Sequence, residues 1–109
     1  MKKLLNIFKS IGLPYAYDHF EVGENIKPPF VIYRFPSSNN FAADGVCFYA
    51  KSKVDIEVYT DKKDLKIEDK VEKILTSFDI FYNKDETYIA SEKFYEVIYS
   101  FELAIESEV

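Results

Sequence analysis

The sequence predicts a single α+β domain, in which a mostly antiparallel sheet carries two helices on one face in the order α-β-β-β-α-β-β. Two segments place apolar residues at helical spacing, and others alternate apolar and polar residues as strands do. The chain has 109 residues, enough for one hydrophobic core, so residues 1–109 are expected to form one domain. Phe and Tyr make up the 17% aromatic share, a composition that favours sheets.

The amino end predicts a short amphipathic helix. Its apolar residues recur at helical spacing, at Leu4, Ile7, Phe8 and Ile11. Gly12 and Pro14 then end the helix, because Gly accepts the left-handed conformation of a helix cap and Pro cannot continue a helix.

Three strands are expected next. The segment YAYDHF, 15–20, predicts a brief strand that ends near His19 and Phe20, and FVIYRF, 30–35, predicts a compact strand buried on at least one face. The clearest strand is 46–60. It alternates two sets, with Val54, Ile56 and Val58 on one face and Lys51, Lys53, Asp55 and Glu57 on the other.

Between two of these strands lies PSSNNFAADG, 36–45, which is too long for a tight hairpin turn and too rich in amides for a core. We expect a surface loop, and long loops in compact domains are often functional. Phe41 in this polar stretch suggests a docking anchor for another protein; the alternative is a lid folded back over the sheet edge. The candidate interaction residues are Ser38, Asn39, Asn40, Phe41 and Asp44.

The chain after residue 60 predicts a second amphipathic helix. Asp64 is expected to be its amino-terminal cap. The buried stripe comprises Ile67, Val71, Ile74, Leu75 and Phe78. The other face alternates Lys with acids and is expected to be exposed, with Glu68 and Glu72 beside Lys66, Lys70 and Lys73.

The last third predicts a hairpin. Its turn chemistry lies at Asn83 to Glu86, and a long strand follows from Phe94 to Glu106. One face of this strand carries Tyr95, Val97, Tyr99, Phe101, Leu103 and Ile105. The other face carries Glu96, Glu102 and Glu106.

The formal charge of −5 argues against sequence-specific nucleic-acid binding, which needs a basic face. The sequence still allows a weak basic patch at the amino end. Residues 79–109, by contrast, hold eight acids and two lysines. Cys47 is the single cysteine, which excludes an intramolecular disulfide and a multi-cysteine zinc site and fits a reducing cytoplasm. The first apolar stretch is interrupted by polar residues and no later one approaches the ~20 residues of a membrane span, so we expect a soluble chain.

No catalytic, cofactor or metal site is expected. His19 is the single histidine, and neither a nucleophile elbow nor a metal-ligand spacing accompanies it. The three glycines are too scattered for a phosphate-binding loop. The acid pairs, Asp18 with Glu21 and Asp85 with Glu86, give no sign of burial.

Five phrases occur in order along nearly the whole chain: GLPYAYDHFEVG, PPFVIYRF, SSNNFAADG, DIEVYTDKKD and EKFYEVIYSFEL. In this order they resemble the small tail-completion, or tail-terminator, proteins encoded in the head-to-tail gene cluster of long-tailed phages and prophages of Gram-positive bacteria. These are often described as minor capsid or minor tail proteins.

The resemblance implies a non-enzymatic structural protein of the virion, assembled in the host cytoplasm as a ring of typically six subunits that caps the tail tube and joins it to the head. Its partners would be copies of itself, the tail tube and the head-connector proteins, and DNA would pass through without being read. In such a ring, 37–45 would be an assembly arm. An acidic lumen would let phosphates slide; its candidates are Glu96, Glu102 and Glu106, with ordinary solvent exposure as the alternative.

A second hypothesis belongs to a different class. It is a small acidic binding module, such as an immunity or inhibitor protein, that occupies a basic partner with its glutamate-bearing sheet face. The third hypothesis is that the chain is an enzyme.

Overall fold

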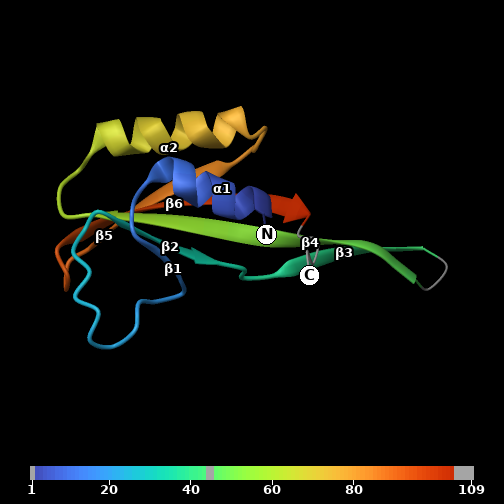
Figure 1. The fold of residues 1–109 in the computed structure, drawn as a ribbon, viewed down its shortest axis with the longest axis horizontal. Coiled ribbons are helices and arrows are strands. Elements are labelled where there is room, and N and C mark those ends of the chain that lie inside the picture. Colours follow the sequence, from blue (N-terminus) through green and yellow to red (C-terminus); the bar gives the residue numbers. More distant parts are fainter. Residues whose placement is uncertain (1, 44–45, 105–109) are drawn as a thin grey trace.

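The structure is a computed structural model that describes residues 2–43 and 46–104. Its elements follow one another as α1 (Lys2–Ile11), β1 (Tyr15–Tyr17), β2 (Phe30–Arg34), β3 (Ser38–Ala43), β4 (Val46–Thr60), α2 (Leu65–Ser77), β5 (Asn83–Ile89) and β6 (Phe94–Ala104). The α+β class and the order of the expected elements are confirmed, and the structure adds one strand, β3 (Figure 1).

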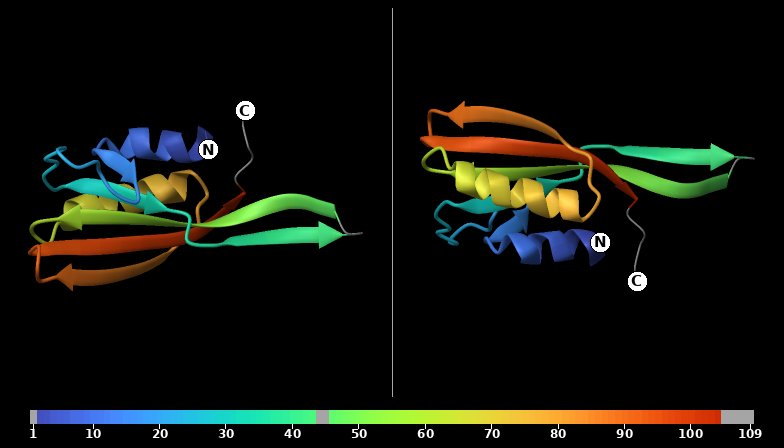
Figure 2. Two further views of the ribbon diagram at one scale, coloured as in Figure 1. Left: turned by 90° about the horizontal axis from the view of Figure 1, so that it is seen from below. Right: turned by 90° about the horizontal axis from the view of Figure 1, so that it is seen from above.

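The strands form one sheet in the order β1-β2-β4-β6-β5, and β3 pairs with β4 beyond the end of β2. The β1 and β2 pair is parallel, and the other pairs are antiparallel. Both helices cover the same face of the sheet, as Figures 1 and 2 show. We call the opposite face the open face.

The hydrophobic core lies between the helices and the sheet. The stripe predicted for α1 is fully buried, at Leu4, Ile7, Phe8 and Ile11. In α2, Val71 and Leu75 are fully buried, and the rest of the predicted stripe packs at the rim of the core. The sheet contributes Val31, Val54, Ile56, Val58, Val97, Tyr99 and Phe101. Each such side chain stabilises the fold by roughly 1.5–3 kcal/mol, so packing holds these two short helices in place.

The two helix ends that the sequence predicts are confirmed. Gly12 has φ 75°, and its N–H donates to the carbonyl of Phe8 at 3.1 Å. The Asp64 carboxylate accepts hydrogen bonds from the N–H groups of Lys66 and Ile67, both at 3.1 Å. Asp64 therefore satisfies two of the donors that the first turn of α2 leaves unpaired.

The expected surface loop at 36–45 is wrong for most of its length. Residues 38–43 form β3, which pairs with β4 from Ser38 opposite Ser52 to Ala43 opposite Val46, with an irregularity between Phe41 and Ala42. Ser, Asn and Ala have little strand propensity, so this strand forms because a partner strand follows it in the chain. Asp44 lies outside the described residues.

The turn expected at Asn83 to Glu86 is also wrong. These residues begin β5, which pairs with β6 from Asn83 opposite Ser100 to Ile89 opposite Phe94. The chain reverses after Ile89 instead, where Lys93 has φ 58°. Charged and polar residues are common on an edge strand, so they do not require a turn. The brief strand expected to end near His19 and Phe20 ends earlier, since β1 stops at Tyr17 and Asp18 has φ 63°.

Candidate interaction surfaces

A β-hairpin extends beyond the rest of the molecule. β2 pairs with β4 only as far as Asp55, and β6 pairs with β4 only as far as Lys51, so among the described residues 46–50 pair with β3 alone. Figures 1 and 2 show β3 and this part of β4 projecting past the helices. We call 38–43 and 46–50 the hairpin arm.

The hairpin arm contains most of the predicted interaction residues. Ser38, Asn39, Asn40 and Phe41 all lie in β3, where Asn39 is opposite Lys51 and Phe41 is opposite Tyr49. The outer edge of β3 has no strand partner among the described residues. Such an edge leaves a row of backbone N–H and C=O groups available to another strand.

A buried glutamate joins three strands on the open face. Glu57 of β4 is only 3% exposed. Its Oε2 accepts a hydrogen bond from Nε of Arg34 in β2 at 3.1 Å, and Nη2 of Arg34 lies 3.0 Å away. The Tyr59 hydroxyl lies 2.8 Å from Oε1 of Glu57 and 2.5 Å from Oε2 of Glu96 in β6. These four residues are the open-face network.

Burial dominates the electrostatics of the open-face network. It raises the pKa of the Glu57 carboxyl above the ordinary 4.5, because the hydrogen bonds from Tyr59 and Arg34 only partly offset the loss of water. Burial is the largest cause that raises the pKa of the Tyr59 phenol, and the hydrogen bonds to Glu96 and Glu57 raise it further. The Tyr59 hydroxyl has one hydrogen, which can serve only one of the two carboxylates. Both short contacts are therefore hydrogen bonds only when the network holds one further proton.

The open face is acidic as a whole. Among the described strand residues, three basic and five acidic residues hold positions on this face by their register: Arg34, Lys51, Lys53, Asp55, Glu57, Asp85, Glu96 and Glu102. The predicted acid Glu96 lies in the open-face network, whereas Glu102 is exposed. Glu106 lies outside the described residues.

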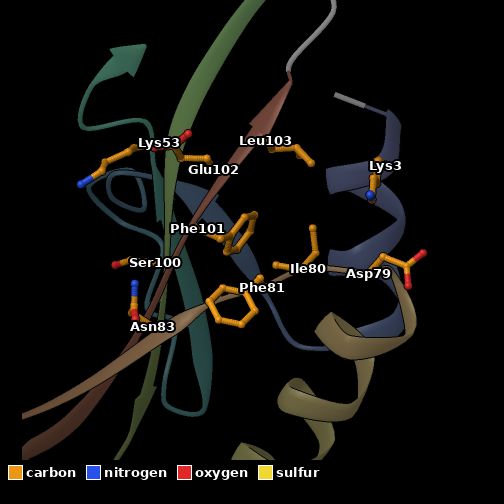
Figure 3. A pocket seen from close by; sticks show the side chains of 10 residues that line it. All are labelled: Lys3, Lys53, Asp79, Ile80, Phe81, Asn83, Ser100, Phe101, Glu102 and Leu103. Atoms are coloured by element: carbon orange, nitrogen blue, oxygen red, sulfur yellow. The ribbon is translucent and has the colours of Figure 1, made fainter.

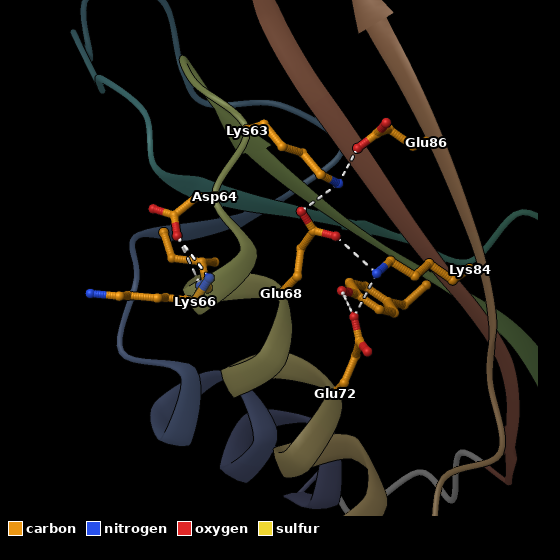
Figure 4. A network of polar contacts seen from close by, with 9 residues as sticks. Lys63, Asp64, Lys66, Glu68, Glu72, Lys84 and Glu86 are labelled. Atoms are coloured by element: carbon orange, nitrogen blue, oxygen red, sulfur yellow. Dashed lines mark hydrogen bonds and ion pairs between the residues drawn. The ribbon is translucent and has the colours of Figure 1, made fainter.

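A second charged cluster joins α2 to β5, and it corrects the expectation that Glu68 lies on an exposed helix face. Glu68 is 4% exposed. Its two carboxylate oxygens lie 2.7 Å from Nζ of Lys63 and 2.8 Å from Nζ of Lys84 (Figure 4). Lys84 also pairs with Glu72 at 2.7 Å, and Lys63 pairs with Glu86. We call these residues the α2–β5 cluster.

The lysines decide the charge state of Glu68. Burial alone would raise the pKa of this carboxyl, but the hydrogen bonds from Lys63 and Lys84 outweigh it and hold the pKa below the ordinary 4.5. The same contacts with Glu68 and Glu72 raise the pKa of Lys84. Sequence reasoning missed this cluster because the lysines that contact Glu68 come from outside the helix.

The candidate catalytic groups do not converge. Nδ1 of His19 lies 3.0 Å from Oδ2 of Asp18, and this hydrogen bond raises the pKa of the imidazole. Both side chains, however, are more than half exposed. Asp85 and Glu86 point to opposite faces of the sheet, as successive strand residues do. Within residues 2–43 and 46–104, no group of His, Cys, Asp or Glu is placed to hold a metal ion.

A hollow of about 610 Å³ lies where β6 extends past the start of β5. Ile80, Phe81 and Phe101 form an apolar side, and Asn83, Ser100 and Glu102 contribute polar groups (Figure 3). Phe81 is 91% exposed. We call this hollow the edge slot.

Two further findings bear on function. In the described part of the chain, neither helix has the length and apolarity needed to cross a bilayer. No protein-family model matches the sequence, and no curated protein is detectably similar to it.

Proposed function

We propose that this chain is a structural assembly protein of a phage or prophage, which forms a ring at the end of the tail tube and joins the tail to the head. The resemblance described from the sequence suggests this role. The hairpin arm is the observation that carries it.

A two-stranded ribbon outside the body of a domain is marginally stable by itself. The hairpin arm has that arrangement, and no other described strand covers the outer edges of β3 and of the 46–50 part of β4. In a closed ring each subunit meets its neighbours through two different surfaces. An arm that reaches out of one subunit is suited to such a contact.

The test uses purified protein with and without purified tail tubes, followed by mass measurement in solution and electron microscopy of tube ends. The natural chain is expected to form a ring, typically of six subunits, on the tube end. Phe41→Asp is expected to weaken ring formation by about tenfold or more, because it places a charge in the interface.

Val22→Asp is the matched control. Val22 is a fully exposed apolar residue, and it lies in the connection between β1 and β2. It should leave assembly unchanged. Ring formation by Phe41→Asp at the natural level would refute the role of the hairpin arm, and the failure of the natural chain to bind tube ends would refute the tail-terminator role.

The acidic open face favours a second candidate, a small binding module for a basic protein. By register, its five acids outnumber three basic residues among the described strands. This candidate predicts a toxin gene beside the gene for this chain, and a complex with that toxin that weakens as salt rises. Portal, capsid and major tail genes nearby would favour the ring instead.

A further inference from the structure

The edge slot is an interruption in the sheet. β4 pairs with β6 as far as Lys51 opposite Ala104, but β5 begins at Asn83 opposite Ser100. Among the described residues, the β6 segment 101–104 therefore has a partner on one side alone. Successive strand residues direct their N–H and C=O groups to alternate sides, so this segment offers backbone hydrogen bonds over a length of about 13 Å.

The lining of the edge slot has the two-sided chemistry of a strand site. Figure 3 shows Phe101 beside Ile80 and Phe81, while Lys53 and Glu102 lie across β6. A strand that continued the sheet here would place alternate side chains against the apolar side and against the polar side. The ligand is therefore an extended segment that alternates apolar and polar residues.

We propose that the edge slot receives the hairpin arm of a second copy of this chain by strand addition. This inference deepens the proposed function, because it names the surface to which the arm binds. In β3, SNNFAA, one alternate set is Asn39, Phe41 and Ala43, and the other is Ser38, Asn40 and Ala42. The first set is the more apolar one and suits the apolar side of the slot, whereas the second suits its polar side.

Charge favours the same occupant. The hairpin arm, 38–43 and 46–50, carries no charged residue, although the chain carries −5. The lining of the slot includes two lysines, Lys3 and Lys53, against Asp79 and Glu102. An uncharged segment meets no net repulsion there, whereas the acidic open face would repel a second acidic surface.

Cross-linking between two differently tagged chains tests the pairing. One chain is the natural sequence, whose single Cys47 lies in the hairpin arm opposite Ala42. The other carries Cys47→Ala and Glu102→Cys, which places its thiol at the exposed edge of the slot. A short bismaleimide is added to the mixture, and the mixed cross-linked dimer is measured on a denaturing gel.

The control partner carries Cys47→Ala and Lys73→Cys, because Lys73 is exposed on the outer side of α2. The Glu102→Cys partner is expected to give at least about tenfold more mixed dimer than the control, since docking raises the local thiol concentration. Adding Phe81→Lys to the Glu102→Cys chain should remove most of that excess, and circular dichroism would check that this exposed substitution leaves the fold intact.

Equal yields from the two partners would overturn the inference. If the natural chain still formed rings on tail tubes, the proposed function would survive and the receiving surface would lie elsewhere. If the mixed dimer formed but no ring did, arm docking would stand and the tail-terminator role would fall.

Discussion

At the scale of single residues, Glu57 has the most unusual environment of the open face. It is buried on a side of the sheet that the helices do not cover, and it contacts Arg34 and Tyr59. Removing a buried hydrogen-bonded carboxyl is costly because its partners stay behind, so this residue contributes to stability whether or not it contributes to binding.

Glu57→Gln is expected to change how stability depends on pH. The pKa of Glu57 is higher in the folded chain than the ordinary 4.5, so its contribution is complete below pH 4.5 and is lost as the pH rises through the folded pKa. Glutamine does not ionise. The free energy of unfolding of Glu57→Gln, relative to the natural chain, should therefore increase as the pH rises from 4.5.

Urea unfolding at a series of pH values measures this difference. Asp85→Asn is the matched control, because Asp85 is an exposed acid on the same face. If the free energy of unfolding of Glu57→Gln changed with pH in parallel with that of the natural chain, ionisation of Glu57 would not be the cause of the pH dependence.

At the scale of elements, the α2–β5 cluster attaches α2 to β5, the strand at one edge of the sheet. Lys84 of β5 contacts both Glu68 and Glu72, which are one helical turn apart in α2. The Tyr99 hydroxyl of β6 donates to Glu72 at 2.8 Å. The helix is therefore attached by charged contacts on one side and by the apolar core beneath it.

Glu68→Gln is expected to destabilise the protein by about 1–3 kcal/mol at neutral pH, because it leaves two lysines with one acid fewer. The pKa of Glu68 is lowered in the folded chain, so its contribution is present above pH 4.5 and is lost as the pH falls through the folded pKa. The difference in the free energy of unfolding between Glu68→Gln and the natural chain should therefore become smaller as the pH falls. This pH dependence is opposite in sign to the one expected for Glu57→Gln.

Asp69→Asn serves as the control for this helix. Asp69 is exposed and pairs only with Lys73, at 2.9 Å, among the described residues. Its loss should cost a few tenths of a kcal/mol at most. Chemical unfolding at neutral and acid pH compares the two variants, and equal effects would argue that Glu68 behaves as a surface residue.

At the scale of the whole molecule, the hairpin arm determines the shape. The radius of gyration is 15.2 Å, and the principal extents are 50 × 31 × 24 Å. A compact domain of this length has a radius of gyration of about 13 Å. The difference follows from a ribbon that extends away from the core between the helices and the sheet.

A shortened variant separates the arm from the fold. Replacing residues 40–50 with Asn-Gly joins Asn39 to its partner Lys51 through a two-residue hairpin turn. This variant is expected to unfold cooperatively, and its radius of gyration should fall by about 2 Å in small-angle X-ray scattering of dilute monomer. Loss of cooperative unfolding would mean that the arm is part of the core fold.

The sequence predicted the elements whose own periodicity decides them. The stripe of Leu4, Ile7, Phe8 and Ile11 identified α1, and Asp64 marked the start of α2. The alternation of Val54, Ile56 and Val58 identified β4 and its buried face. The sequence also selected 37–45 as a candidate interaction segment, although as a loop and not as the strand β3.

The tertiary structure decided what depends on a partner distant in the chain. β3 is a strand because β4 pairs with it, and the polar start of β5 is a strand because β6 pairs with it. In the sequence, Glu57 and Glu68 look like the acids that are exposed, yet both are buried. Arg34 and Tyr59 contact Glu57, and Lys63 and Lys84 contact Glu68. Local sequence thus sets periodicity and caps, whereas cross-strand pairing and the burial of charge arise only when distant segments meet.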